Sequence, residues 1–437
     1  MKLTIHRGTQ EIGGSCVEVK SRNNRIVIDI GIPIVTLSGK KFDFKDYKKL
    51  PLEELIASKI LPDIKGFYRQ DGKDGLIDGL LISHAHIDHY GFYNFANEDI
   101  QYYLGEATHK LINLSNIFIE DRGLIKKVAY IQDGTQFHIG DFKITPFLMD
   151  HSAFDAYAFL IEADGRKLFY SGDFRSHGRK GKLFYKFIRT APEDIDALLL
   201  EGTSINGGSL NPEFKKEEVV EHETAKVLKE HKTIVFGIAS SQNIDRMVSF
   251  YKAAKRTGRL FVVDVYTANV LTETGNPNIP HPSTSYPDIR VFFPRHLCNK
   301  LEKHQNKDMM YKFASYKITK DEIAVRQSNV FMLIKSSMRS YLNGIKNLGA
   351  SPVIYSMWNG YFNEPSMKDF VRTLTKGYDR LICRIHTSGH ADVSSLKRFV
   401  SRLRPDKIIP IHTFGHQMYK EHFKNVMEIS DGQEIEI

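Results

Sequence analysis

The sequence predicts an α/β protein made of two parts that arrange their strands differently. The chain has 437 residues, more than one ordinary hydrophobic core accommodates. Up to about residue 205, short β-rich runs dominate with helices between them, as in sheets covered by helices. Beyond that point strands and helices alternate at the spacing of a parallel α/β domain. We therefore expect two domains of different architecture.

The first part begins with β-strands joined by turns. The runs "KLTIHR", "SCVEVK" and "NRIVIDI" are separated by "EIGGS" and "SRNN", which have the composition of turns. Residues 36 to 75 are lysine-rich and irregular, with one short helical pattern at "PLEELIAS". "GLIDGLLIS" then predicts a buried strand that ends at Ser83. Further strands are expected at "TQFHI", "FKITPFLMD", "AYAFLIEA", "RKLFYSGD" and "IDALLLEGT".

The second part alternates between helices and strands. "KKEEVVEHETAKVLKEH" and "NIDRMVSFYKAAKRTG" predict helices, each followed by a strand, "TIVFGIAS" and "RLFVVDVY". The lysine-rich residues 295 to 327 predict a helical, basic insert. Later strands are expected at "NVFMLIK", "SPVIYS", "LICRIHTSGH" and "KIIPIHTFG".

The composition is that of a globular, cytoplasmic protein. Hydrophobic residues make up 41% and charged residues 26%, and no apolar run is long enough to span a membrane. The polar N-terminus lacks the apolar region of a signal peptide. Three distant cysteines argue against a disulfide framework or a thiolate metal site and fit a reducing cytoplasm. The net charge of +9 favours a polyanionic partner such as nucleic acid, although many proteins are simply basic.

A cluster of histidines directly follows the strand that ends at Ser83. "SHAHIDHYG" holds His84, His86, Asp88 and His89 within six positions. A lone histidine at a strand end is usually structural, but four potential ligands this close together are typical of a metal site. Imidazole and carboxylate ligands without thiolates suit zinc, with manganese or iron as alternatives.

Three further metal-ligand candidates stand at the ends of later strands. They are His151 in "LMDHSAFD", Asp173 in "YSGDFRS" and His412 in "IPIHTFG". With the four residues of the histidine cluster, they can hold two divalent cations bridged by a hydroxide, as in two-metal hydrolases.

These motifs, taken in order, resemble those of the metallo-β-lactamase superfamily. The resemblance implies a four-layered αβ/βα sandwich with the metals at one sheet edge. It divides the ligands between two ions: His84, His86 and His151 on the first, Asp88, His89 and His412 on the second, and Asp173 between them. Asp29 in "VIDIGI" matches an early aspartate of the superfamily, which implies that it orients a metal ligand. Alternatively, Asp29 caps the turn that follows its strand.

The long continuation of the chain resembles the β-CASP branch of this superfamily. "LLLEGT" presents Glu201, and "IHTSGHA" presents His386 and His390 ahead of His412, which is the order of the β-CASP nuclease motifs. "HTSGHA" is particularly similar to ribonuclease J and its archaeal relatives. The resemblance implies a metal domain of residues 1–205 and 371–437 and an inserted β-CASP domain of residues 206–370.

A phosphodiesterase needs more than the metals. The hydroxide attacks phosphorus, and His390 is the candidate proton donor or charge stabiliser for the leaving alkoxide. Glu201 would hold His390 or its loop through a hydrogen bond, or alternatively act as a helix cap or in a surface salt bridge. The candidate catalytic residues are Asp29, Asp88, Glu201 and His390.

A second set of residues is expected near the substrate's phosphates. "FGIASSQNIDRM" predicts a strand that ends in a serine-rich turn and opens a helix, whose N-terminus suits phosphate. Similar turns and the "HxSGH" loop hold nucleotide phosphates in ribonuclease J-like proteins. The resemblance therefore implies a phosphate-binding set of Ser240, Ser241, His386 and Ser388, with Arg246 and Arg384 adding charge-assisted contacts. Ordinary capping by Ser241 or Gln242 is compatible with this assignment.

Two departures from ribonuclease J are visible. "YSMWNGYFNEPSM" replaces a short glycine-rich stretch, and its Trp358 and Tyr361 either stack on nucleobases or pack between domains. The sequence ends at "SDGQEIEI" without the C-terminal domain that supports dimers of ribonuclease J, so the oligomeric state stays open.

We expect a metal-dependent ribonuclease, with 5′-to-3′ exonuclease action as one form of this activity. The expected cofactors are two divalent ions, Zn²⁺ first and Mn²⁺ second, and the expected partner is RNA rather than DNA, with no membrane. The alternatives are a DNA nuclease of the same fold, a catalytically inactive nucleic-acid-binding subunit, and a small-molecule hydrolase, which the basic insert disfavours.

Overall fold

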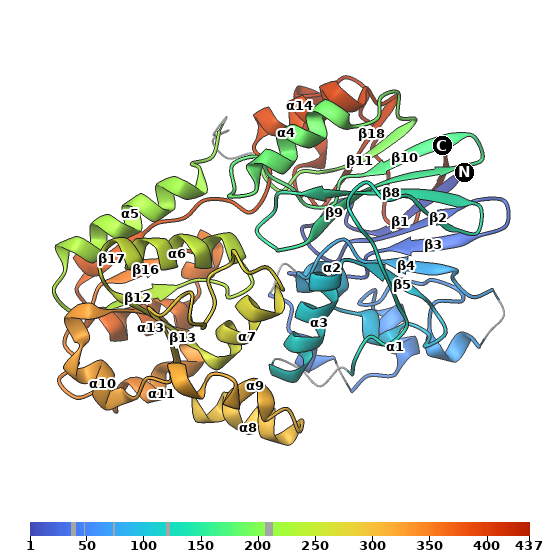
Figure 1. The fold of residues 1–437 in the computed structure, drawn as a ribbon. Coiled ribbons are helices and arrows are strands. Elements are labelled where there is room, and N and C mark those ends of the chain that lie inside the picture. The colour runs from blue at the N-terminus through green and yellow to red at the C-terminus, as the bar shows by residue number, and fades with distance from the viewer. Residues whose placement is uncertain (36–40, 48, 73–74, 119–122, 206–212) are drawn as a thin grey trace.

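The computed structural model describes residues 1–35, 41–47, 49–72, 75–118, 123–205 and 213–437, which form three β-sheets with helices packed against them (Figure 1). None of the described helices combines the length and the apolar character that crossing a bilayer requires.

The first sheet is mixed. Its strands are β1 (Lys2–Arg7), β2 (Cys16–Lys20), β3 (Arg25–Ile28), β4 (Gly79–Leu81), β5 (Tyr102–Leu104), β6 (Val128–Tyr130) and β19 (Glu434–Glu436). They lie in the order β19-β1-β2-β3-β4-β5-β6, antiparallel as far as β3 and parallel from β3 to β6. The expected N-terminal strands and turns are confirmed, whereas β5 and β6 were not predicted.

The second sheet joins segments that are far apart in the sequence. Its strands are β7 (Phe137–Ile139), β8 (Phe142–Met149), β9 (Ala156–Ala163), β10 (Arg166–Tyr170), β11 (Ala197–Glu201) and β18 (Lys407–Ile411), in the order β18-β11-β10-β9-β8-β7. β18 pairs in parallel with β11, and Ile411 lies opposite Glu201. This register brings the predicted ligand His412 to the end of the strand that carries Glu201.

These two sheets form the expected αβ/βα sandwich. Residues such as Leu3 and Val17 of the first sheet pack against Phe159 and Leu168 of the second. Helices α1 (Leu52–Ala57) and α3 (Glu106–Phe118) cover the first sheet, and α4 (Gly181–Thr190) and α14 (Val393–Leu403) cover the second (Figure 1). The predicted fold class is therefore confirmed.

The third sheet is parallel throughout. Its strands are β12 (Val235–Ile238), β13 (Leu260–Asp264), β14 (Ile289–Phe292), β15 (Val330–Leu333), β16 (Val353–Tyr355) and β17 (Ile382–Arg384), in the order β14-β13-β15-β12-β16-β17. Helices α5 (Glu217–Glu230), α6 (Ile244–Arg256) and α7 (Val265–Glu273) pack on one face. Helices α10 (Lys320–Val325), α11 (Arg339–Leu342) and α13 (Pro365–Thr375) pack on the other, while α8 (Arg295–Lys303), α9 (Asp308–Tyr311) and α12 (Asn359–Phe362) complete this region.

The parallel α/β pattern and the helical character of residues 295 to 327 are confirmed. One strand ends earlier than predicted, because Asp264 accepts a hydrogen bond from the backbone N–H of Thr267 at 2.7 Å and so starts α7. The division of the chain at residues 205 and 370 stays a prediction. β17 places residues 382–384 in the third sheet, beyond the expected second boundary.

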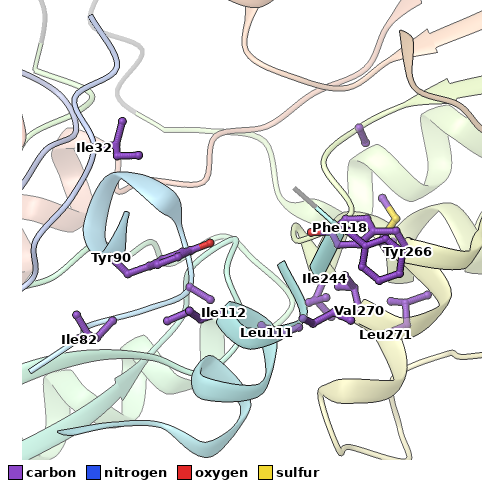
Figure 2. Close-up of a cluster of buried hydrophobic side chains, with 14 of the residues drawn as sticks. Ile32, Ile82, Tyr90, Leu111, Ile112, Phe118, Ile244, Tyr266, Val270 and Leu271 are labelled. Carbon is purple, nitrogen blue, oxygen red and sulfur yellow. The ribbon is translucent and has the colours of Figure 1, made fainter. Parts of the chain in front are cut away.

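An apolar contact joins the sandwich to the third-sheet region. Leu111, Ile112 and Phe118 of α3 lie on one side, and residues of α6 and α7 lie on the other (Figure 2). The rings of Phe118 and Tyr266 are 5.1 Å apart between centroids. Burial of these side chains from both parts fixes the relative position of the two halves of the molecule.

Phe399 tests the packing of α14 on the sandwich. Its ring is fully buried and lies 4.5 Å from Phe174 and 4.8 Å from Phe187. We expect Phe399→Ala to lower the free energy of unfolding by about 3–5 kcal/mol, because it removes these contacts and leaves a cavity. Urea denaturation followed by circular dichroism measures this. Val325→Ala, at a side chain that is 87% exposed, should stay within about 0.5 kcal/mol of wild type; equal effects of the two variants would contradict this view of the core.

Candidate metal centre

Asp29 organises the segment that carries the histidine cluster. Its backbone has a φ of 59°, and its buried carboxylate accepts hydrogen bonds from Ser83 N at 2.7 Å and Ser83 Oγ at 2.7 Å. It also accepts from His89 Nδ1 at 2.8 Å and from the Tyr170 hydroxyl at 2.7 Å. These donors come from other segments and not from the turn after Asp29. The arrangement fixes the His89 ring and directs its Nε2 toward Asp173, which supports the predicted orienting role.

The structure brings together all seven predicted metal ligands. Four of them follow β4, in a segment that forms the short helix α2 (Ile87–Tyr90), and the other three stand at the ends of β8, β10 and β18. Four groups have ligand atoms within 4.8 Å of one another: His84, His86 and His151; Asp88, His89 and His412; His84, His89 and Asp173; and Asp173, Glu201, His390 and His412.

The closest contacts are between atoms that cations prefer as ligands. His151 Nε2 lies 3.1 Å from His86 Nδ1, and His89 Nε2 lies 3.1 Å from Asp173 Oδ2. His412 Nε2 lies 3.3 Å from Asp88 Oδ2. Ring nitrogens and carboxylate oxygens therefore converge on one small volume.

Several of these atoms have no hydrogen-bond partner among the described residues. They are the buried atoms His84 Nε2, His89 Nε2, His151 Nδ1 and Asp173 Oδ1. A buried polar atom left without a partner costs about 1–3 kcal/mol. Bound divalent cations would satisfy His84 Nε2, His89 Nε2 and Asp173 Oδ1, and the donor set of imidazoles and carboxylates suits such ions. His151 faces the cluster through its other nitrogen, Nε2, which lies 4.0 Å from Asp173 Oδ2. The residues therefore fit a divalent metal.

The pKa shifts of several predicted ligands suit metal binding, whereas burial is outweighed at His89 by Asp173 and Asp29, which raise its pKa well above the usual value. Burial, followed by the neighbouring imidazoles, lowers the pKa of His84 well below its usual value. Burial likewise lowers the pKa of His86 to about 4. Burial alone would raise the pKa of Asp173, but His412, His89 and His390 hold it well below its usual value. Neutral imidazoles and an ionised carboxylate are the forms that ligate cations.

Glu201 and His390 adjoin the metal ligands. Glu201 is buried and accepts hydrogen bonds from Ala391 N at 3.1 Å and Thr203 N at 3.0 Å. His390 Nδ1 lies 3.6 Å from Glu201 Oε2 and 3.6 Å from Asp173 Oδ2. Burial opposes protonation of His390, but Asp173 and Glu201 outweigh it and raise its pKa to about 9. Glu201 thus fixes the backbone of the His390 loop, and its carboxylate and that of Asp173 flank the imidazole.

The expected phosphate-binding set is only partly in place. The prediction for Arg246 is wrong: its guanidinium is fully buried, and its Nε donates to Glu217 Oε1 at 2.7 Å. Ser241 is also buried, and its hydroxyl is paired with Thr267 Oγ1 at 2.7 Å. The expected capping by Ser241 or Gln242 is wrong as well, because Asn243 accepts from Arg246 N at 3.0 Å and caps α6.

The remaining members of the set are accessible to different degrees. Ser240 and His386 are exposed, and Ser388 Oγ accepts from His390 N at 3.0 Å. Arg384 is exposed on β17, but its guanidinium lies over Phe362, 4.1 Å from the ring centroid. Ser240, His386 and Ser388 therefore remain the better candidates for contacts to a phosphate.

Sequence reasoning missed two residues that shape the site. Arg175 is fully buried, and it donates to Ser388 O at 2.8 Å and to Asp245 Oδ2 at 2.5 Å. Thr203 Oγ1 lies 2.9 Å from His412 Nδ1. Arg175 follows the predicted site residue Asp173 by two positions, and Thr203 follows Glu201 by two positions. That proximity is the only sequence signal for either residue.

Two families match the parts of the chain that form this site. Residues 67–226 match the beta-lactamase superfamily domain. Residues 380–431 match the Zn-dependent metallo-hydrolase RNA specificity domain, and this range includes His386, His390 and His412.

Similar proteins cover nearly the whole chain. An RNase J-like protein of Methanocaldococcus jannaschii is 23% identical over 95% of this chain and 93% of its own length. Ribonuclease J of Helicobacter pylori (strain B128) is 21% identical over 100% of this chain but only 60% of its own length. The crystal structure of a protein of unknown function from Enterococcus faecalis V583 has a TM-score of 0.77 at 19% identity and covers 99% of both chains, which shows the fold alone.

The fold, the histidine and aspartate cluster and the matched domains define a divalent-metal protein of the metallo-β-lactamase superfamily. Within that superfamily, the chain is a β-CASP protein similar to ribonuclease J.

The burial of Arg246 leads to a stability prediction. We expect Arg246→Met to lower the free energy of unfolding by about 3–5 kcal/mol, because it leaves Glu217 buried without its main partner. Adding Glu217→Leu should recover part of this loss, because no buried carboxylate then remains at that position. Urea denaturation of both variants measures the effect.

Arg256 provides the matched control on the same helix. Its ion pair with Glu221 has the same 2.7 Å separation, but the Arg256 side chain is 58% exposed. Arg256→Met should therefore cost no more than about 1 kcal/mol. An equal cost for Arg246→Met and Arg256→Met would contradict the assignment of Arg246 to a buried structural pair.

Proposed function

We propose that this chain is a metal-dependent ribonuclease that hydrolyses phosphodiester bonds of RNA. The observation that carries the proposal is that His390 lies beside the cluster of candidate metal ligands, on a loop that Glu201 holds in place. The match of residues 380–431 to an RNA specificity domain supports RNA over DNA. The names of the similar proteins, ribonuclease J and RNase J-like protein, support the same substrate.

The metal site that we propose holds two divalent ions, with zinc as the first candidate and manganese as the second. The ligands would be His84, His86 and His151 for one ion, Asp88, His89 and His412 for the other, and Asp173 for both. A divalent cation supplies Lewis acidity at the phosphoryl oxygens and makes a water molecule a stronger nucleophile. The match to a Zn-dependent metallo-hydrolase domain supports zinc.

Individual residues of the chain orient the ligands, position the substrate and deliver a proton. Asp29 keeps the His89 ring in one orientation, and Glu201 keeps the His390 loop in place. The His390 side chain is 21% exposed, so it faces the side from which a substrate approaches. Its imidazole can deliver a proton to the leaving alkoxide near neutral pH. Ser388 and His386, on the same loop, would bind phosphate oxygens.

Two alternatives remain within the same fold. A DNA nuclease would use the same metal chemistry, and an inactive nucleic-acid-binding subunit would need none of it. Every predicted ligand position holds a residue that can bind a metal, which favours an enzyme. A 5′-to-3′ exonuclease mode is part of the proposal, and so is work in a reducing cytoplasm, which the free Cys16, Cys298 and Cys383 favour.

Cleavage assays test the proposed reaction. The purified chain with zinc or manganese should degrade 5′-monophosphorylated single-stranded RNA faster than the matching DNA. His84→Ala should abolish cleavage, and His390→Ala should lower kcat by about 10²–10⁴-fold, because it removes only the proton donor. His138→Ala, at an exposed position on β7, is the control and should behave as wild type. Absence of metal-dependent cleavage of either RNA or DNA would contradict the proposal that this chain is an enzyme.

Metal content tests the two-ion site separately from activity. After dialysis, elemental analysis should find two divalent ions per wild-type chain. His151→Ala should retain about one, because it removes a ligand of only one ion, whereas Asp173→Ala should retain fewer than one. Two ions retained in Asp173→Ala would count against its proposed place between them. His390→Ala should keep both ions, which separates its role from metal binding.

A further inference from the structure

Trp358 lies at the edge of the third sheet that adjoins the metal centre. The neighbouring strands β12, β16 and β17 end at this carboxyl edge, and the segments that follow them carry Ser240, Trp358 and His386 respectively. Ligands of parallel α/β sheets bind outside the carboxyl ends of the strands. Because β16 lies between β12 and β17, the Trp358 segment lies between the two segments that hold the candidate phosphate-binding residues.

The Trp358 ring is fixed on one side and open on the other. The side chain is 62% exposed. A Cβ atom added to Gly360 would lie 1.9 Å from the ring, so the ring rests directly on the Gly360 backbone. The Tyr361 ring stands against it edge-on, 5.4 Å away at an interplanar angle of 88°. The Tyr355 hydroxyl donates to Trp358 O at 3.1 Å, which anchors the backbone beneath.

The same segment is bound to the His390 loop. Arg246 Nη1 donates to Ser356 O at 3.0 Å, and the Ser356 hydroxyl donates to Ile385 O. Arg246 Nη2 also donates to Thr387 O at 3.3 Å. One buried guanidinium therefore holds both segments. It binds Ser356, two residues before Trp358, and Thr387, three residues before His390.

Tyr361 and Lys41 connect the ring to the metal side of the molecule. Lys41 comes from the part of the chain that also carries the predicted metal ligands His84 to His89. Lys41 Nζ lies 5.9 Å from the centroid of Tyr361 and pairs with Glu364 at 3.0 Å. A flat apolar surface and a cation therefore occur together where the Trp358 segment meets the N-terminal part of the chain.

We propose that Trp358, backed by Gly360 and Tyr361, is a stacking platform for one base of a single-stranded RNA whose phosphates are bound at the metal centre. This rests on the proposed ribonuclease function and names the part of the substrate that the edge of the third sheet binds. Every base presents a π-face, so stacking there is tolerant of sequence. The ring is already fixed, so little side-chain freedom is lost on binding.

The chain contains one tryptophan, which gives a direct readout of this contact. A short 5′-monophosphorylated RNA with hydrolysis-resistant phosphorothioate linkages should quench the tryptophan emission of the metal-loaded protein on binding. Moving a single abasic site along this RNA should identify one position at which the quenching is lost and the Kd rises about tenfold. Unchanged emission at saturating RNA, or the lack of any RNA binding, would overturn the proposal.

Variants separate stacking from folding. Trp358→Ala should raise the Kd about tenfold, as measured by fluorescence anisotropy of labelled RNA, while Trp358→Phe should stay within about threefold because it keeps an aromatic face. Tyr311→Ala, at an aromatic side chain on α9 that is 59% exposed, is the matched control and should bind as wild type. Equal affinity of Trp358→Ala and wild type would overturn the platform.

The two proposals fail in different ways. RNA that binds and quenches Trp358 but is never cleaved with metal would contradict the ribonuclease and support the platform. Metal-dependent cleavage of unmodified RNA by a protein whose tryptophan emission does not respond to the resistant RNA would support the ribonuclease and overturn the platform.

Discussion

Two guanidinium groups buried between the sandwich and the third sheet hold the composite site together. Arg175 joins Asp245 and the carbonyl of Ser388, and Arg246 joins Glu217 and the loop that leads to His390. A charge removed from water must keep its partners, because losing one leaves the other uncompensated. Since these partners lie on three separate segments, the pairing permits only one placement of that loop relative to the metal ligands, and the proposed proton donor depends on that placement.

Asp29 imposes the corresponding constraint from the side of the sandwich. Its carboxylate gathers donors from the segment after β4 and from Tyr170 on β10, so one side chain fixes both sheets at the metal edge. The His89 nitrogen that remains faces Asp173. The candidate metal ligand His89 is thus pre-arranged by a hydrogen bond behind it, so binding an ion there would require little rearrangement of its ring.

The parts of the site that could be predicted are those carried by local sequence. Candidate ligands that closely follow strands, such as His84 and Asp173, could be predicted from the sequence, because the end of a strand places the next side chains at one edge of the sheet. The burial of Arg246 could not be predicted in this way. Its partner Glu217 lies 29 positions away, and an amphipathic helix pattern does not show which of its charged side chains is buried. The same limit applies to helix capping: Asn243 caps α6, two positions after Ser241, which was one of the expected caps.

The buried network also couples two groups that we propose act on different parts of a substrate. Arg246 binds Ser356 on the segment that leads to Trp358, and Thr387 on the loop that leads to His390. The paired register of β16 and β17, in which Tyr355 lies opposite Arg384, fixes the starting points of both segments. The distance between the proposed stacking platform and the proposed proton donor is therefore set by the interior of the protein and not by flexible surface loops. A substrate strand that satisfies both contacts is held in one register relative to the metal ligands, and correct positioning of this kind lowers the barrier to reaction.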